Sequence, residues 1–307
     1  MVGGSGMELS KRRVVRTTGD KAFILINYTF LCIILAIILY PLIYVVSASF
    51  SSPSAVMSGR VVLWPVDLSV KGYEAIFSNK QILSGYGNSL LYTVAGTALN
   101  VALTLMAAYP LSRGNRVIMG SKIIMFIYVF TMLFSGGLIP SFLLINRLGL
   151  YNTRWALILP GGLSVWNMLI TRTFFIANIP AELYEVSELE GAGGFRIFLQ
   201  VVLPLSATII AVNVLFYAVG HWNSYFNAMI YLKDARLFPL QIIMRNILII
   251  NQVDASMLSV EELEMREGMK ELLKYSLIVV ASAPVLMIYP FVQKHFVRGV
   301  MIGSIKG

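Results

Sequence analysis

Charged residues are scarce in this sequence: Asp, Glu, Lys and Arg make up only 13% of the 307 residues. A soluble domain carries about a quarter, roughly twice this share. Hydrophobic residues account for 57%, and the mean hydropathy is +0.76. This composition excludes an ordinary soluble protein and predicts a polytopic membrane protein whose apolar surplus faces lipid.

Cysteine is also scarce, and nucleotide-binding motifs are missing. The single cysteine, Cys32, lies inside an apolar run, so it excludes a disulfide framework or a cysteine metal site and is expected to be a small buried hydrophobe. No G-x-x-x-x-G-K-[ST] motif is present, and the glycines of 191–196 (GAGGFR) lack the third glycine of a dinucleotide site. The chain itself is therefore not expected to bind ATP, another cofactor or a metal.

Long apolar stretches are what the sequence does contain. They are approximately 22–50, 86–112, 123–146, 155–171, 197–230 and 275–293, and no Asp, Glu, Lys or Arg lies inside them. A helix needs about 20 residues to cross the hydrocarbon core, with about 17 as the lower limit, and the fourth stretch is at that limit. The runs are continuous rather than alternating, so an all-α protein with six transmembrane helices is predicted.

Basic residues indicate the orientation. With both termini in the cytoplasm, the inside segments hold 13 Lys and Arg and the outside segments 11, and their net charges are +7 and +2. The cluster before the first helix is the strongest signal, because basic residues near span ends stay inside. The net charge of +9 thus fits membrane topology, and no nucleic-acid-binding motif accompanies it.

The predicted organisation follows. It comprises a cytoplasmic segment 1–21, a transmembrane domain 22–293 with a cytoplasmic loop 172–196 and an extracytoplasmic loop 231–274, and a cytoplasmic tail 294–307. The opening MVGGSG has no expected role in the fold and could be an expression remnant. In the outer loop, Ser259 is predicted to cap an amphipathic helix.

The most acidic segment, residues 181–205, reads AELYEVSELEGAGGFRIFLQVVLPL and lies in the second cytoplasmic loop. Asn178 can cap a helix there, Pro180 suits its first turn, and Gly191 suits a left-handed stop, so about three turns of helix are predicted. Its glutamates favour the positive N-terminal end of a helix.

Two functions are conceivable for this helix. A catalytic carboxylate pair needs two carboxyl groups on opposite sides of a pocket with separated pKa values, which solvated glutamates on one short helix do not offer. Leu183, Val186 and Leu189 form an apolar stripe beside the glutamates. An element that a partner protein binds is therefore favoured.

The same segment resembles the cytoplasmic loop of ABC importer permeases, with the pattern E-A-A-x-x-x-G, nine residues, then I-x-L-P. Here Glu185-Val186-Ser187 precedes three residues, Gly191, nine residues and 201–204 (VVLP). Every anchor has the family's spacing, although Val186, Ser187 and Val201 replace the two alanines and the isoleucine. The segments FSGGLIPSFLLINRLGLYNTRWALILP, RTFFIANIPAELYE and FVRGVMIGSIKG extend the resemblance over about residues 22–307. They are similar to carbohydrate permeases of the maltose-transporter type, in the branch linked to complex oligosaccharides, including uronic-acid-containing ones.

The resemblance implies a permease subunit in the bacterial cytoplasmic membrane. It implies partners: a second permease subunit, two ATPase subunits that hold ATP and magnesium, an extracytoplasmic solute-binding protein, an oligosaccharide and membrane lipid. It also implies a coupling helix docked in a cleft of the ATPase, and the residues that match it or its link to the next span are Glu185, Val186, Ser187, Leu189, Glu190, Gly191, Ala192, Leu203 and Pro204. A shorter match suggests that the C-terminal tail reaches the ATPase pair through Gly303, Lys306 and Gly307. The chain would be no enzyme itself, and helix movement would alternate access to a central path.

The fifth apolar stretch holds the candidates for a substrate path, and these are His221, Trp222, Asn223, Tyr225 and Asn227. Polar groups at membrane depth usually face protein or a water-filled cavity, and aromatic rings with amides suit sugars. Hydrogen bonds between helices and an interfacial aromatic belt are the slightly favoured alternative. Asn88, Tyr92 and Asn100 are weaker candidates, expected mostly to pack.

Other function classes stay open at this point. A permease for a different solute has the same fold. An ATP-independent carrier usually needs intramembrane charges that couple to an ion gradient, and the six stretches have none. A membrane-embedded enzyme needs a Ser/His/Asp or metal constellation, which is not evident in the stretches either.

Overall fold

The structure is a computed structural model that describes residues 17–247 and 260–303, with side chains of the last helix described for 268–288 and for Pro290. Within these residues every regular element is a helix. The α-helices are α1 (Thr18–Ser49), α2 (Pro53–Met57), α3 (Lys71–Ser78), α4 (Lys80–Arg113), α5 (Ser121–Leu133), α6 (Leu138–Arg147), α7 (Trp155–Ile158), α8 (Val165–Asn178), α9 (Ala181–Leu189), α10 (Gly194–Ile197), α11 (Leu203–Leu205), α12 (Ala207–Trp222), α13 (Phe226–Tyr231), α14 (Leu240–Arg245) and α15 (Val260–Gly303). The all-α class is confirmed.

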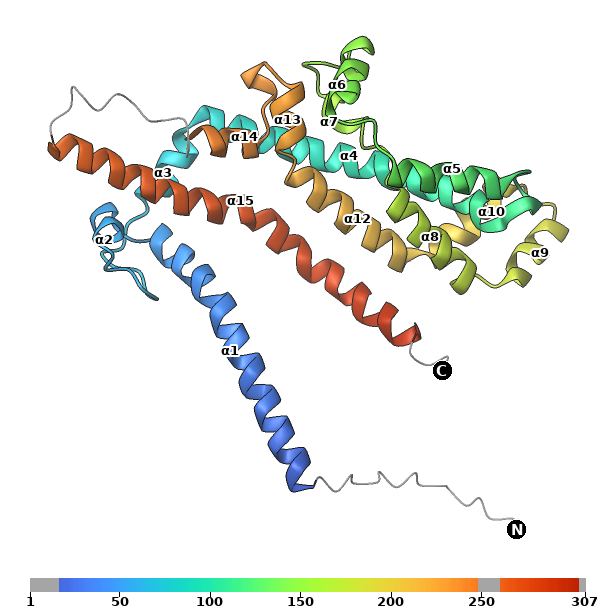
Figure 1. Ribbon diagram of the computed structural model, residues 1–307, viewed down its shortest axis with the longest axis horizontal. Helices are drawn as coiled ribbons and strands as arrows, with labels where there is room; N and C mark the ends of the chain where they lie inside the picture. Colours follow the sequence, from blue (N-terminus) through green and yellow to red (C-terminus); the bar gives the residue numbers. More distant parts are fainter. Residues whose placement is uncertain (1–16, 248–259, 304–307) are drawn as a thin grey trace.

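The long helix α4 is the centre of the molecule. It packs against α8 and α12 over much of its length and against α14 near its start (Figure 1). Its inward face is polar: Asn88, Thr93, Thr97, Asn100 and Thr104 are all buried at helical spacing. Asn88, Asn100 and Thr104 hydrogen-bond to other segments of the chain, whereas the Thr93 and Thr97 hydroxyls have no partner among the described residues. The three bonded side chains help to fix which segments pack on α4.

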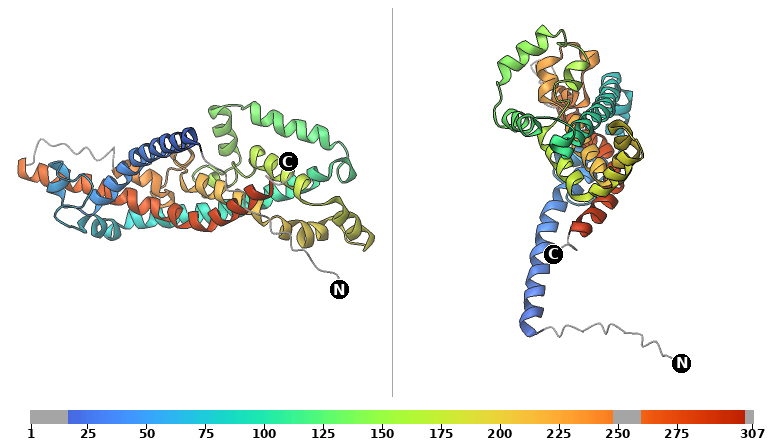
Figure 2. Two further views of the ribbon diagram at one scale, coloured as in Figure 1. Left: turned by 90° about the horizontal axis from the view of Figure 1, so that it is seen from below. Right: turned by 90° about the vertical axis from the view of Figure 1, so that its right-hand side faces the viewer.

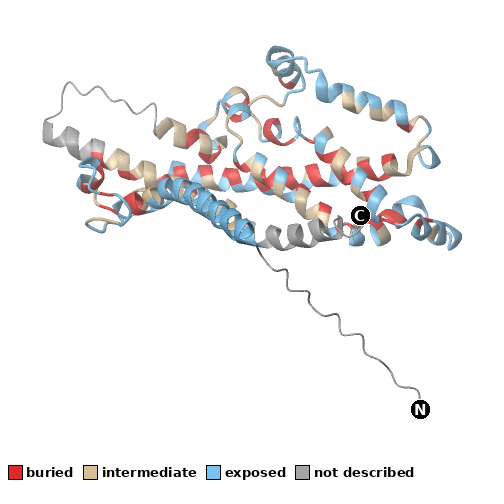
Figure 3. Ribbon diagram, turned by 60° about the horizontal axis from the view of Figure 1, so that its bottom comes forward, coloured by how far each residue is buried: buried red, intermediate tan, exposed pale blue. Residues whose placement is uncertain are grey.

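Helix α1 lies apart from this bundle and contacts mainly α15 (Figures 1 and 2). It begins with a capping box, in which Thr17 Oγ1 accepts from the Asp20 amide and the Asp20 carboxylate accepts from the Thr17 amide. Its 32 residues span about 48 Å at 1.5 Å per residue, enough to cross the hydrocarbon. Most of the helix is exposed (Figure 3), and Cys32 is exposed with it. The expectation that Cys32 is buried was wrong, because no part of the described chain covers this stretch of α1.

Among the residues that the structure describes, three helices are long and apolar enough to span a membrane: α1, the run Lys80–Arg116, and the part Gly268–Ile288 of α15. Two bent pairs of helices bring the number of spans to five if each pair counts as one span. The third predicted stretch is the pair α5 and α6, bent by 114° after Leu133. The fifth is the pair Gly194–Leu205 and α12, bent by 83° at Ser206. Hydropathy alone gave no sign of these bends.

The fourth predicted stretch, 155–171, differs most from expectation. It is not one helix, because residues 159–164 separate the four-residue α7 from α8. The sequence there, LPGGLS, contains a proline and two glycines, which interrupt helices. In the described part of the outer loop, the predicted amphipathic helix is continuous with the last span as α15, whereas its proposed cap Ser259 lies outside the described residues.

Candidate functional site

The acidic segment folds as predicted into a short helix, α9, but its start differs. Pro180 occupies the N-cap position, and the Asn178 side chain instead donates back to Phe174 O (3.0 Å) at the end of α8. The prediction that Asn178 caps α9 was therefore wrong, since its amide is used by the preceding helix. Glu182 lies in the first turn, where a carboxylate favours the helix dipole.

The end of α9 is a left-handed stop. Gly191 has φ of +77°, its amide donates to Glu188 O, and the Ala192 amide donates to Ser187 O, both at 3.0 Å. This pair of bonds is the Schellman motif, which requires a residue that tolerates positive φ. The predicted role of Gly191 as a helix stop is confirmed.

The inner face of α9 is fixed to the end of α4. Tyr184 is buried, its ring lies 6.5 Å from that of Tyr109, and the Arg113 guanidinium carbon lies 3.8 Å from its centroid. Arg113 Nη2 also lies 2.6 Å from Glu188 Oε1. Burial raises the pKa of the Tyr184 hydroxyl, whereas the charge of Arg113 opposes that rise. The hydroxyl therefore stays neutral at ordinary pH, and the contact is a cation over an aromatic face.

The outer face of α9 is apolar and uncovered. Leu183, Val186 and Leu189 are 39%, 54% and 88% exposed. A second ion pair, Arg116 to Glu185 at 3.7 Å, lies at the exposed edge. An amphipathic helix normally buries its apolar stripe. Here polar residues and Tyr184 attach the helix to the membrane domain, and the apolar stripe is left for another surface.

The remaining residues of the predicted coupling segment lead from α9 to the fifth span. Ser187 is half-buried and donates to Leu183 O (2.6 Å), Glu190 is exposed as the C-cap, and Ala192 packs against the buried core. A π-helical turn, Phe198–Val202, then precedes Leu203 and Pro204. A proline ring displaces the carbonyl four residues earlier, which explains the wider turn. The 83° bend follows directly.

The five candidates on the fifth stretch lie in different surroundings. His221 is half-buried, and its Nε2 lies 3.1 Å from Asn100 Nδ2. The ring lies directly against Gly96, where an added Cβ would clash with it. Trp222 is buried, and its Nε1 donates to Ala281 O (2.9 Å) on α15. Both side chains connect helices in the way that the alternative interpretation expects.

The other three candidates follow the end of α12. Asn223 is exposed, its Nδ2 donates to Val219 O, and it lines a pocket beside α15 together with Trp222. The Tyr225 hydroxyl contacts Met229 Sδ at 3.2 Å. Asn227 is exposed and lines a different pocket, between α6 and α13. The structure does not bring these side chains together in one site.

The weaker candidates on α4 hold other parts of the chain in place. Asn88 Nδ2 donates to Arg236 O and Phe238 O, and the Tyr92 hydroxyl donates to Leu237 O. Asn100 Nδ2 donates to Gly161 O (3.0 Å) in the break of the fourth span. Of the predicted tail contacts, Gly303 ends α15, whereas Lys306 and Gly307 lie outside the described residues.

Sequence reasoning missed the residues that hold α9 and the broken span. To identify Arg113 and Tyr184, one would have had to know that two positions 71 residues apart in the chain are in contact. Tyr217 was also missed: its hydroxyl contacts Thr104 Oγ1 (2.6 Å) and accepts from the Ser164 amide (3.0 Å). A buried tyrosine within an apolar span is the signal that could have drawn attention to it. Among the described residues, no group of three His, Cys, Asp or Glu could hold a metal ion.

Residues 100–302 match the family described as binding-protein-dependent transport system inner membrane component. The chain belongs to this family. It is thus a permease subunit of a bacterial ABC importer, in the inner membrane, and the predicted resemblance is confirmed. Membership does not favour the ATP-independent carrier.

Several relatives share nearly the whole chain. The polygalacturonan/rhamnogalacturonan transport system permease protein YtcP of Bacillus subtilis is 41% identical over 94% of this chain and 99% of its own. Protein LplC of the same organism is 35% identical over 95% and 97%. A permease chain in the crystal structure of a bacterial ABC transporter that imports the acidic polysaccharide alginate superposes with a TM-score of 0.84, at 32% identity, covering 91% of this chain and 98% of that one.

Proposed function

We propose that this permease forms one half of the translocation unit of an importer for acidic, uronic-acid-containing oligosaccharides. The other half would be a second, different permease subunit. Two relatives support the substrate class: a 41% identical permease is named for polygalacturonan and rhamnogalacturonan, and a solved relative belongs to an alginate importer. Galacturonic acid units and alginate units are both uronic acids. The runner-up is a permease of the same design for another solute.

The exposed apolar face of α9 carries the proposal for the mechanism. Leu183, Val186 and Leu189 would dock in a groove of an ATPase subunit, one of a pair that holds ATP and magnesium. Closure of that pair on ATP would displace α9. Arg113 would pass the displacement to α4, and the segment that ends at Pro204 would pass it to α12. A binding protein on the outer side would deliver the sugar.

The docking step can be tested with a matched pair of valines. Val186 and Val62 are 54% and 53% exposed, but only Val186 lies on α9. Val186→Asp places a charge in an apolar interface, so we expect the complex to lose the ATPase on purification while the permease still inserts. Val62→Asp, in the predicted outer loop, should retain it. Equal retention of the ATPase by both variants would contradict the proposed docking of α9.

The substrate class needs a separate measurement. Proteoliposomes that contain the whole importer and its binding protein should take up labelled oligogalacturonates in an ATP-dependent manner. Neutral maltodextrins of equal length should compete weakly. Uptake of the neutral sugar alone would overturn the acidic substrate and leave the permease assignment intact.

A further inference from the structure

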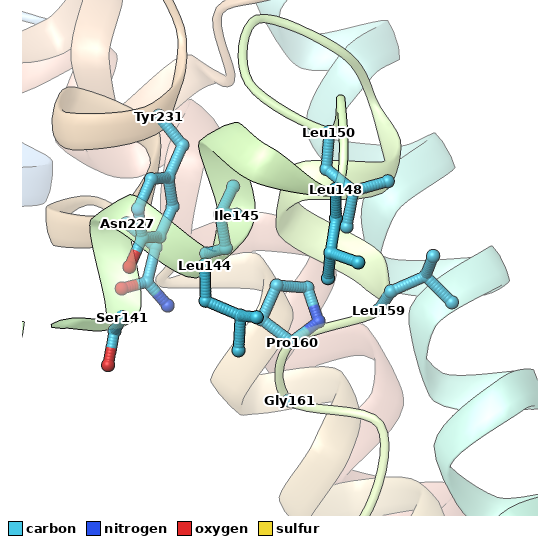
Figure 4. A pocket seen from close by; sticks show the side chains of 10 residues that line it. All are labelled: Ser141, Leu144, Ile145, Leu148, Leu150, Leu159, Pro160, Gly161, Asn227 and Tyr231. Carbon is cyan, nitrogen blue, oxygen red and sulfur yellow. The ribbon is translucent and has the colours of Figure 1, made fainter. Parts of the chain in front are cut away.

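A pocket of about 480 Å³ lies between α6, the segment after α7, and α13 (Figure 4). It is lined by Ser141, Leu144, Ile145, Leu148, Leu150, Leu159, Pro160, Gly161, Asn227 and Tyr231. Pockets for small molecules have volumes of about 300–1,000 Å³, so one or two sugar rings fit. On the predicted topology these segments lie in the outer half of the membrane, where a substrate released by a binding protein would enter.

The polar side chains of the pocket gather on one side. In Figure 4, Ser141, Asn227 and Tyr231 lie together, and the leucines and Pro160 lie on the other side. Asn227 and Tyr231 are four residues apart on α13 and so share one face. Ser141 Oγ donates to Gly137 O (2.8 Å), which leaves its lone pairs as acceptors. In the described part of the chain, no hydrogen bond involves the side-chain amide of Asn227 or the hydroxyl of Tyr231.

This polar wall is held in a fixed position. The Tyr231 ring stacks on the Phe142 ring, with centroids 6.3 Å apart and planes at 16°. The backbone carbonyl of Tyr231 accepts from the backbone amide of Asn152 (2.8 Å). Asn152 has φ of +58°, and its Oδ1 accepts from the amides of Lys233 and Asp234, each at 2.8 Å. The tyrosine is therefore pre-positioned, which lowers the entropy lost when a ligand binds.

The floor of the pocket is the break in the fourth span. The Leu159 amide makes the last helical bond of α7, to Trp155 O (3.0 Å), and the helix does not continue through Pro160 and Gly161. The Gly161 carbonyl instead accepts from Asn100 Nδ2. Irregular backbone at membrane depth is tolerated where it is buried in protein or lines a water-filled cavity. In transporters, interrupted helices of this kind mark substrate sites.

We propose that Ser141, Asn227 and Tyr231 form a sugar subsite in this permease, a role that rests on the proposed oligosaccharide import. The Asn227 side-chain amide and the Tyr231 hydroxyl can each donate and accept, and Ser141 Oγ can accept, which matches the adjacent hydroxyl groups of a sugar ring. The leucines and Pro160 face the C–H surface of the ring. No lining residue carries a charge, so the subsite binds the hydroxyl edge of the sugar and leaves its carboxylate in the aqueous path.

Uptake by the complete importer in proteoliposomes tests the subsite. Asn227→Ala and Tyr231→Phe each remove hydrogen-bonding groups, and we expect uptake to fall about 3- to 10-fold, the effect of one or two lost bonds. Asn146→Ala is the matched control, because Asn146 is exposed on α6 but does not line the pocket. The phenylalanine variant keeps the stacked ring, so the yield of assembled complex should match the parent.

Occupancy can be measured directly because the chain has one cysteine. In a Cys32→Ala background, Leu144→Cys introduces the only thiol of this subunit, in the lining of the pocket, and leaves Ser141, Asn227 and Tyr231 in place. A membrane-impermeant maleimide should label it from outside, and the binding protein loaded with oligogalacturonate should slow labelling at least 3-fold. A lipid chain or a partner's side chain in the pocket would block labelling with and without sugar, and that result overturns the proposal.

The two proposals fail in different ways. If the parent importer takes up no acidic oligosaccharide, the proposed substrate is wrong. If the parent transports and both Asn227→Ala and Tyr231→Phe retain full uptake, only the subsite is wrong.

Discussion

Arg113 Nη2 and Glu188 Oε1 lie 2.6 Å apart, although the two residues are 75 positions apart in the chain. Arg113 is the last residue of α4, and its side chain is only 7% exposed. The same guanidinium covers the ring of Tyr184. One side chain thus attaches the docking helix to the helix at the centre of the molecule, and α9 cannot move without acting on α4.

Replacement of Arg113 should weaken this attachment. In Arg113→Ala both the ion pair and the cation–π contact are lost, about 1–2 kcal/mol together after allowance for the half-exposed carboxylate. We expect sugar-stimulated ATP hydrolysis and uptake by the importer to fall about 5- to 10-fold. Arg113→Lys keeps the charge and should recover part of the activity.

Arg116→Ala is the control for this variant. Arg116 lies 3.7 Å from Glu185, and both side chains are largely exposed, so loss of this ion pair should have little effect. If Arg116→Ala and Arg113→Ala reduce coupling equally, net positive charge at this surface matters and the specific contact does not.

Gly191 and Gly193 allow a test of the stop of α9. Neither has an atom within 4 Å of an added Cβ, but Gly191 has φ of +77° and Gly193 has φ of −68°. Alanine at Gly191 is strained by about 1 kcal/mol or more, whereas alanine at Gly193 is tolerated. Gly191→Ala should lower the amount of ATPase that co-purifies, and Gly193→Ala should not. Equal behaviour would mean that the end of α9 has no part in docking.

The docking helix shows which features a sequence specifies locally. The stop at Gly191 was predictable because a Schellman motif depends on one residue's conformation. The start was predicted at Asn178 instead of Pro180, because an asparagine can cap the next helix or bond back into the previous one. The attachment to Arg113 could not be predicted, since it depends on how α4 and α9 meet in space.

In the transmembrane helices, too, local features were predictable and features that depend on packing were not. Hydropathy located the apolar stretches, but it averages over the breaks at 134–137 and 159–164. The glycine pairs in FSGG and LPGG were the local signals for both breaks. The angle at each break depends on packing, so the sequence could not provide it. The substrate candidates failed to converge for a related reason, because α12 ends at Trp222 and the chain changes direction within the predicted cluster.

The packing of Tyr184 between α9 and α4 should depend on pH only in the alkaline range, because ionisation would place a charge in a buried site and the attraction of Arg113 only partly offsets that cost. Burial raises the pKa of Tyr184 above its ordinary value of 10.0. The stabilising contribution of the neutral hydroxyl is fully present below about pH 10 and is lost as the pH rises through the folded pKa. Limited proteolysis at residues 190–194 should therefore be constant from about pH 7 to 9 and accelerate above about pH 10. Tyr184→Phe should abolish this rise, and an unchanged rise would assign it to another group.

The Tyr217 hydroxyl should stabilise the broken fourth span. It is buried against Thr104 and accepts from the Ser164 amide at the start of α8. Tyr217→Phe leaves both partners without this bond inside the protein, which costs about 1–3 kcal/mol. We expect the Tm of the purified complex to fall by about 2–6 °C. Tyr28→Phe, on the exposed face of α1, is the control and should leave the Tm unchanged. Equal Tm values for the two variants would mean that water replaces the hydroxyl and that the span break is solvated, not held by Tyr217.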